Sequence, residues 1–472
     1  MFQTQVLGNP VCDGPFLNDK QILQAATFLV AGGSPELLSE KVLMTLAEIG
    51  KTSVDKLSNE KVLNKILSKL VSGKNNSLAS EVAGEQIAAA KNVLIKSDPD
   101  LNRLYTNDVE DGLKGWGWEL LPKNDKAFND PEFLAKLVKQ SDAVGVGSSM
   151  MDPSHADRFF RDEFKLLTKD KLYIETFART GSDANNYFYE IANKVVSNRL
   201  KKKVEDAEVL VFSGSYGGVI GKIADKGMLR GGYTPYNIQS PHTAHFEPTD
   251  AMEISRLEEL EKKSLNEIRE KFESSEHPIG GILLEPILGA RGVLFYRTEF
   301  LLELRKLCDE LEIPILADEV LTGGGRTGKF FAFEHYEGFE PDYVTFGKGL
   351  QVSGLASYTR KKSPYFPGFN LGPVTSQASP DSLLKGAQVL KRIRTDKLME
   401  NAEQTGEYLL KKLQELSNKT SPEEIRGKGL MLYTDVISNR YLGIGGAFGR
   451  ITPPLTLTPK QIDDLASKKL NE

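Results

Sequence analysis

LADEVLTGGGRTGKFFAFEHYEGFEPDYVTFGKGL, residues 316–350, joins two short apolar runs that each lead to a charged residue. The first run, IPILADEV at 313–320, reaches Asp318, and the second, PDYVTFG at 341–347, is followed directly by Lys348. Short runs rich in aliphatic and aromatic residues, bounded by glycine and proline, indicate buried strands. Because ligands collect at the carboxyl edge of an open α/β sheet, we expect Asp318 and Lys348 to share one edge.

Further apolar runs alternate with helical patterns on either side of this stretch. Additional strands are predicted at 142–147, 171–177, 207–214 and 280–287. Helices are predicted at 181–200, 252–276 and 300–312. This alternation is typical of an α/β domain whose mostly parallel sheet is covered by helices on both faces.

Changes in pattern divide the chain into three predicted regions. Residues 1–130 carry apolar residues at helical spacing and are predicted to be a helical N-terminal region. One such stripe consists of Val42, Leu43, Leu46 and Ile49. Residues 131–381 are predicted to form the large α/β domain. Residues 382–472, which begin with helical patterns and end with strands and a last helix, are predicted to form a smaller α/β domain.

The composition limits the classes of partner. The 472 residues are 26% charged with a formal net charge of −5, which offers no electrostatic basis for binding nucleic acid. We see no signal peptide and no apolar run long enough to cross a membrane. Cys12 and Cys308 lie far apart in the sequence, which argues against a disulfide framework and favours the reducing cytoplasm. The five histidines show no metal-ligand spacing, so no metal site is predicted.

Residues 323–329, GGGRTGK, fit the glycine and lysine spacing of a phosphate-binding loop. Such a loop requires Ser or Thr next, because that hydroxyl binds magnesium, and Phe330 occupies the position. The aromatic residues that follow are also poorly suited to a helix that presents amides to a phosphate. The nucleotide-binding interpretation is therefore rejected.

An aspartate and a lysine at one sheet edge suit pyridoxal phosphate (PLP). The Lys348 amine would form a Schiff base with the cofactor aldehyde, and the Asp318 carboxylate would keep the pyridine nitrogen protonated. Side chains alternate along a strand, so Val320 shares the face of Asp318 and is predicted to lie against the cofactor ring. Glu319 points the other way and is predicted to be structural. Taken alone, Asp318 would be interpreted as a residue that caps a loop, and Lys348 as a surface lysine.

The full stretch closely resembles the signature of the class III aminotransferases, PLP enzymes of fold type I. The shared features are Asp-Glu-Val, a GRTG loop, Pro-Asp before a strand and Lys-Gly, and the resemblance extends from about residue 175 to the C-terminus. It implies a seven-stranded, mostly parallel sheet in the large domain. TGSDANN, at 180–186, resembles the family segment that holds the cofactor phosphate, which implies that role for Gly181, Ser182 and Asp183.

Other family segments supply further expected site residues. SGSYGG resembles a turn whose aromatic residue stacks on the pyridine ring, which implies that role for Tyr216. LLEPILGARGV retains Glu285, near the substrate in relatives, but has Leu288 in place of a Gln and Ala290-Arg291 in place of Glu-Gly.

Two segments near the C-terminus complete the resemblance. Thr375 matches a residue that reaches the phosphate of the neighbouring subunit, which implies a homodimer with composite sites. GRITPPL resembles a family segment and makes Arg450 a candidate clamp for a substrate carboxylate. A salt bridge from Arg450 to Glu285 or another acid is the alternative.

The predicted function is amino transfer from a terminal amine or amino acid to a 2-oxo acid, with Lys348 as general base and acid. Two alternatives stay open at this level. The changes between Glu285 and Arg291 leave room for epimerisation, racemisation or decarboxylation with the same cofactor. A scaffold without catalysis is disfavoured, because it would not need both Lys348 and Asp318.

Overall fold

The computed structural model describes part of the chain. The described residues are 22, 25, 26, 40–57, 59, 62, 63, 66, 119–122, 125–130, 133, 155–227, 234–358, 378–417, 421, 424–434 and 449–470. The chain forms two compact units, one of residues 1–106 with 123–146 and one of residues 107–122 with 147–472. The domain boundaries expected at 130 and 381 stay a prediction.

The first unit contains helix α3 (Glu40–Gly50) and the short 3-10 helices η2 (Val54–Lys56) and η3 (Lys126–Asn129). Val42 and Leu46 of α3 are buried in a cluster that includes Ile66. Leu43 and Ile49 are partly buried against the same cluster, so the four residues of the predicted stripe share it.

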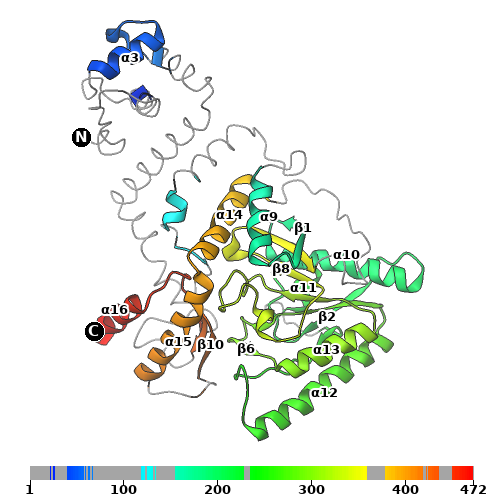
Figure 1. Ribbon diagram of the computed structural model, residues 1–472. Helices are drawn as coiled ribbons and strands as arrows, with labels where there is room; N and C mark the ends of the chain where they lie inside the picture. Colours follow the sequence, from blue (N-terminus) through cyan, green and yellow to red (C-terminus); the bar gives the residue numbers. More distant parts are fainter. Residues whose placement is uncertain are drawn as a thin grey trace. The chain divides into compact units, whose positions relative to one another are not determined.

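The second unit is built on a seven-stranded sheet in the order β1-β9-β8-β7-β4-β2-β3 (Figure 1). The strands are β1 (Leu172–Ala178), β2 (Glu208–Phe212), β3 (Asn237–Ile238), β4 (Ile279–Leu284), β7 (Ile315–Asp318), β8 (Tyr343–Phe346) and β9 (Ser353–Tyr358). Strand β9 is antiparallel to β1 and to β8, and the other described pairings in this sheet are parallel. The sheet is therefore mostly parallel, as the sequence predicts.

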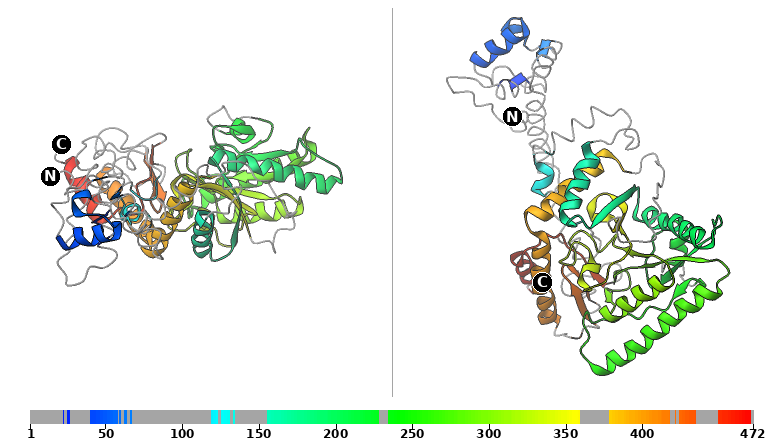
Figure 2. Two further views of the ribbon diagram at one scale, coloured as in Figure 1. Left: turned by 90° about the horizontal axis from the view of Figure 1, so that it is seen from above. Right: turned by 45° about the vertical axis from the view of Figure 1, so that its right-hand side comes forward.

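Helices pack around this sheet. They are α9 (His155–Leu167), α10 (Gly181–Leu200), α11 (Gly221–Lys226), α12 (Ala251–Ser274), α13 (Thr298–Glu310) and α14 (Pro380–Thr395). Helix α15 (Leu398–Ser417) packs against strand β10 (Ile425–Lys428) instead, and α16 (Pro459–Leu470) packs against α15. Helix α10 buries Phe188 and Val195 in one cluster with Leu283 and Leu316 of the central strands. In Figures 1 and 2, α12 and α13 run alongside each other, and α9 lies beside α14. Burial of the central strands between such helices explains why β4, IGGILL, carries no polar side chain and β7, ILAD, carries one only at its end.

Two smaller sheets complete the unit. Strands β10 (Ile425–Lys428), β11 (Met431–Thr434) and β12 (Arg450–Ile451) pair antiparallel near the C-terminus. Strands β5 (Ile287–Leu288) and β6 (Leu294–Phe295) form a hairpin. Short 3-10 helices η5 (Ala332–His335) and η6 (Lys348–Leu350) follow β7 and β8.

Two strands of the large sheet, β3 and β9, carry no strong sequence signal. Strand β3 has two residues, and β9 reads SGLASY, which lacks β-branched residues. Pairing with β1 on one side and β8 on the other holds β9 in the sheet. The predicted strand at 142–147 lies outside the described residues. None of the described helices has an apolar stretch long enough to cross a membrane.

Glu319, directly after β7, has a structural position. Its carboxyl group accepts hydrogen bonds from the Thr322 hydroxyl and, at 2.8 Å, from the Phe333 amide at the start of η5. Complete burial raises the pKa of Glu319 to about 8, against these hydrogen bonds, which lower it. Glu319 therefore contacts Thr322 and Phe333, as expected for a structural residue that points away from the face of Asp318.

Glu319 should make stability fall as pH rises. With an unfolded pKa of 4.5 and a folded pKa of about 8, the folded chain keeps a proton in this window that the unfolded chain has lost. The free energy of unfolding therefore decreases between these pH values. Glu319→Gln cannot titrate and should show a shallower decline, measured by urea unfolding at a series of pH values. The same slope in Glu319→Gln and in the unaltered protein would contradict this account, and Glu337→Gln, at an exposed position, serves as the control.

Candidate functional site

Lys348 and Asp318 meet at the carboxyl edge of the large sheet. Asp318 is the last residue of β7 and pairs in register with Thr345 of β8, and Lys348 begins the turn after β8. The Lys348 Nζ lies 5.5 Å from the centre of the Tyr216 ring. Within the described residues, this Nζ makes no hydrogen bond or ion pair. Lys348 is partly buried and lines a cavity, so its amine is accessible to a ligand.

Asp318 is held by a hydrogen-bond network that the sequence analysis missed. Asn185 Nδ2 donates to Asp318 Oδ2 at 2.6 Å, and the Thr345 hydroxyl donates to Asn185 Oδ1 at 2.7 Å. The Val320 amide donates to the other Asp318 oxygen at 3.1 Å. Helical periodicity in the sequence could have indicated Asn185. It lies one helical turn after Gly181, and a polar residue on the buried face of α10 needs a partner.

Glu285 is the second buried acid of the site. It follows β4 and accepts hydrogen bonds from the Tyr216 amide and, at 3.2 Å, from the Gly289 amide. It therefore connects the turn that carries Tyr216 to the turn of the β5–β6 hairpin.

Burial and mutual repulsion shift the titration of these groups. Burial raises the pKa of Glu285, and the neighbouring Asp318 charge raises it further. Burial also raises the pKa of Asp318, although the Asn185 hydrogen bond lowers it. The pKa of Lys348 is lowered, first by burial and then by Arg450, while Asp318 and Glu285 oppose the shift. These shifts bring the pKa values of the two acids and of the amine closer together than in water, as is typical of sites that transfer protons.

Arg450, in β12, is 9% exposed, and its Nε has no hydrogen-bond partner. Burial lowers the pKa of Arg450, and the negative charge of Glu285 opposes this shift. No salt bridge joins Arg450 to Glu285 or to another acid among the described residues. A structural ion pair of Arg450 is therefore not observed in this part of the chain. A buried guanidinium without a counter-ion can bind an anion.

Arg326 of the GRTG loop holds the segment that follows Arg450. Its guanidinium is fully buried and donates to the backbone oxygens of Leu430, Pro453 and, at 2.8 Å, Glu119. These bonds join the loop after β7 to the C-terminal sheet. Residue Arg326 therefore fixes the backbone near Arg450, a role for which the sequence offered no signal beyond the motif.

The start of α10 faces the same edge of the sheet. Thr180 caps the helix by accepting from the Asp183 amide, and its hydroxyl donates to the Asp183 carboxylate at 3.0 Å. The Ser182 hydroxyl accepts from the Val219 amide at 3.1 Å. A Cβ on Gly181 would lie 2.5 Å from a methyl group of Val320, so only glycine allows this approach.

These residues fit a PLP group. The fit rests on an amine without a partner at Lys348, a buried carboxylate at Asp318, an aromatic ring at Tyr216 and a helix start at Gly181. A cavity of about 420 Å³ beside Lys348 is lined also by Arg179 and by Ser353, Ser379 and Ser382. Of the residues predicted for the site, Thr375 lies outside the described residues.

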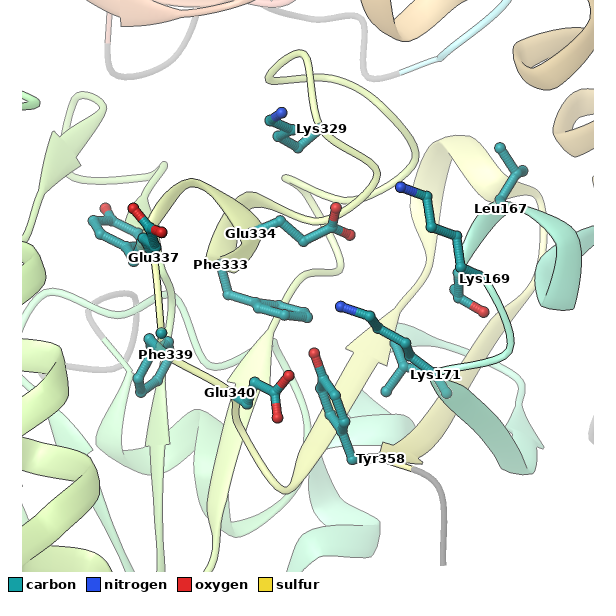
Figure 3. Close-up of a pocket in the computed structure, with 14 residues that line it drawn as sticks. Leu167, Lys169, Lys171, Lys329, Phe333, Glu334, Glu337, Phe339, Glu340 and Tyr358 are labelled. Atoms are coloured by element: carbon teal, nitrogen blue, oxygen red, sulfur yellow. The ribbon is translucent and has the colours of Figure 1, made fainter. Parts of the chain in front are cut away.

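A different cavity, of about 310 Å³, lies where β1 begins and β9 ends, at the edge of the sheet opposite to Lys348 (Figure 3). Figure 3 shows the amines of Lys169 and Lys171 directed toward Glu334. None of the predicted site residues lines this cavity. Within the described residues, no group of three or more His, Cys, Asp or Glu side chains is arranged to bind a metal ion.

Comparison with known proteins gives one family. The model of the family "Aminotransferase class-III" matches residues 126–468. An acetylornithine aminotransferase of Caldanaerobacter subterraneus is 33% identical over 218 residues, which is 42% of this chain and 55% of that protein. An L-lysine-epsilon aminotransferase of Mycobacterium tuberculosis is 27% identical, over 71% of this chain and 80% of the relative.

Two further matches bear on the reaction and the fold. An alanine/serine racemase of Pyrococcus horikoshii is 28% identical over 69% of this chain and 74% of its own length. A solved structure of a lysine aminotransferase from M. tuberculosis superposes with a TM-score of 0.65 and 25% identity, covering 76% of this chain and 88% of that one.

Proposed function

The chain belongs to the class III aminotransferase family, whose members are PLP-dependent enzymes, and on this premise we propose that it moves an amino group from a terminal amine bearing a distant carboxylate to a 2-oxo acid. The observation that carries the choice of substrate is Arg450, a buried cation beside Glu285 and Tyr216 without an ion-pair partner among the described residues. A substrate carboxylate would neutralise that charge.

Each residue would have a distinct task. When bound, PLP supplies a ring that withdraws electrons from the substrate carbon next to the transferred nitrogen. Lys348 would bind the cofactor through Nζ and later move a proton with the same atom. Asp318, oriented by Asn185, would hold the ring nitrogen. The start of α10 at Gly181 would bind the phosphate.

Incubation of the PLP-loaded protein with terminal amines and 2-oxo acids tests this function. We expect an amino acid formed from the oxo acid in equal amount to the carbonyl product, detected by mass spectrometry. Racemisation is the second candidate, because of the alanine/serine racemase relative. Loss of the optical activity of L-alanine or L-serine in the absence of any oxo acid would favour racemisation over amino transfer.

Arg450→Met should separate substrates by charge. We expect KM for an amine with a carboxylate to rise about ten- to a hundredfold, because a charge-assisted bond to the guanidinium is lost. KM for an alkyl amine of the same length should change little. Steady-state kinetics with 6-aminohexanoate and hexylamine measures the difference, and equal losses for both amines would contradict a carboxylate clamp at Arg450.

We further propose a cytoplasmic homodimer with Thr375 of each subunit reaching the site of the other. Val219 and Ile220, close to Tyr216 in sequence, are large apolar side chains that are 51% and 46% exposed. A two-fold interface near the site would cover them, and such symmetry is the commonest assembly. Light scattering of the purified protein tests the dimer, and a monomer at micromolar concentration would exclude it.

A further inference from the structure

The segment that follows Tyr216 is held against helix α10 by Asn186. Helix α11, which begins five residues after Tyr216, packs against α10 (Figure 1). Asn186 Nδ2 donates to the Ile220 oxygen at 2.9 Å, and the Ile223 amide donates to Asn186 Oδ1 at 3.4 Å. A Cβ on Gly221 would lie 2.3 Å from Asn186 Nδ2, so the backbone touches this side chain closely. One side chain of α10 therefore fixes the start of α11.

The other end of α11 is held by its last residue, Lys226. The Lys226 amine donates to the Glu208 carboxylate and to the Tyr189 hydroxyl, and it lies 4.9 Å from the centre of the Tyr236 ring. Lys226 is 5% exposed, and lysine is rarely buried to this extent unless it is paired. The Asn237 side chain also donates to the Lys226 backbone oxygen at 2.8 Å. The end of α11 is therefore fixed to β2, α10 and β3.

Helix α11 packs directly against the turn that carries Tyr216. A Cβ on Gly227, the residue after α11, would lie 2.1 Å from the Tyr216 oxygen. A Cβ on Gly217 would lie 2.8 Å from the Ile223 oxygen, and Gly217 has a φ of 69°, which favours glycine. The position of α11 therefore determines the position of the Tyr216 ring, whose centre lies 5.5 Å from Lys348 Nζ.

The two anchors indicate that α11 needs one defined position. The helix has six residues, and an isolated helix of this length is not stable in water. A buried ion pair such as Lys226–Glu208 is not the most stabilising way to anchor it, because removal of both charges from water costs free energy. Apolar residues of similar volume often stabilise a fold as well or better, but they fix a position less specifically.

We propose that Asn186 and Lys226 are positioning residues, which hold the Tyr216 ring in place for the cofactor. This inference rests on the proposed function, in which Lys348 binds PLP next to that ring. Both residues act on the ring through α11. Loss of either anchor lets α11 and the turn shift together, and the ring then makes a poorer contact with PLP.

Titration of the full chain with PLP, after removal of bound cofactor, tests the role of Asn186. In Asn186→Ala, the Kd for PLP should rise about threefold to tenfold, which corresponds to the loss of an offset aromatic contact. Asn193→Ala is the matched control. Asn193 lies about two turns farther along α10 and accepts from the Ala207 amide at 3.0 Å. We expect the control to leave the Kd for PLP unchanged.

The Lys226 anchor is tested by removal of both charges. Lys226→Met alone would leave Glu208 without its cation and would destabilise the fold, so the variant is Lys226→Met with Glu208→Gln. The Kd for PLP should rise, and the visible circular dichroism of PLP bound at saturation should change, because it depends on the groups around the ring. Arg305→Met with Asp342→Asn removes another largely buried ion pair, and this control should retain both the Kd and the spectrum.

A double-mutant cycle with Tyr216→Leu decides whether the anchors act through the ring. When Tyr216 is already leucine, Asn186→Ala should raise the Kd for PLP no further. An equal rise with and without the Tyr216 ring overturns the inference, as does an unchanged Kd in Asn186→Ala and in the variant that lacks the Lys226–Glu208 pair. The cycle needs no substrate. A chain without amino transfer therefore contradicts the proposed function, while the cycle still decides the positioning role.

Discussion

Replacement of Lys348 by alanine is expected to lower the rate of amino transfer about a thousandfold or more. The side chain would both bind the cofactor covalently and move the proton, and loss of a positioned acid-base group alone costs about 10²- to 10⁴-fold. The visible absorbance of the bound cofactor should shift as well, because the amine that holds it is gone. Stopped-flow and steady-state assays of the PLP-loaded variant measure both effects.

Two controls make the Lys348 result specific. Lys348→Arg keeps a positive charge in the cavity but cannot take the same covalent role, so it should be as inactive as Lys348→Ala. Added ethylamine should partly restore turnover in Lys348→Ala, since a free amine can enter the space and move the proton. Retention of a tenth or more of the original rate in Lys348→Ala would remove this residue from the reaction.

Replacement of Asp318 by asparagine is expected to lower kcat about a hundredfold or more. The carboxylate would stabilise positive charge on the ring nitrogen, and removal of one such preorganised group costs about 10²- to 10³-fold. The amide would also face Asn185, which now donates to Asp318 Oδ2 at 2.6 Å, and the network with Thr345 would be disturbed. Steady-state kinetics and cofactor titration measure the effect on turnover and on PLP affinity.

The neighbouring acid is the matched control for Asp318. Glu319→Gln changes the next residue by the same chemistry, but Glu319 contacts Thr322 and Phe333 instead of the site. We expect Glu319→Gln to retain most of the activity while it alters stability as a function of pH. Equal kinetic losses in the two variants would show that the effect of Asp318→Asn comes from the fold rather than from the ring nitrogen.

The architecture was largely predictable because it depends on local pattern. Short runs rich in apolar and β-branched residues identified β1, β2, β4, β7 and β8. The central strands β4 and β7 are buried along their whole length and so show no alternation. Helix α10 begins at Gly181 as expected, because Thr180 is a cap that the sequence displays. Strand β9 was missed because its neighbours, and not its own residues, hold it in place.

Site residues were predictable only where they directly follow a strand, because the end of that strand determines their position. Asp318 and Lys348 follow adjacent strands, so the sequence alone determined that both reach one edge. Asn185 lies 133 residues from Asp318, and no local signal connects them. The same holds for Arg326, whose partners lie in three separate segments.

The sequence by itself determined the alternation of strands and helices, the edge at which the chemistry lies and the family to which the chain belongs. Only the tertiary structure decided which buried charges have partners. Lys226 is paired with Glu208, whereas Arg450 has no counter-ion among the described residues. The reason is physical: strand and helix formation follows from residues close in the chain, but burial and charge neutralisation depend on contacts between segments far apart in it.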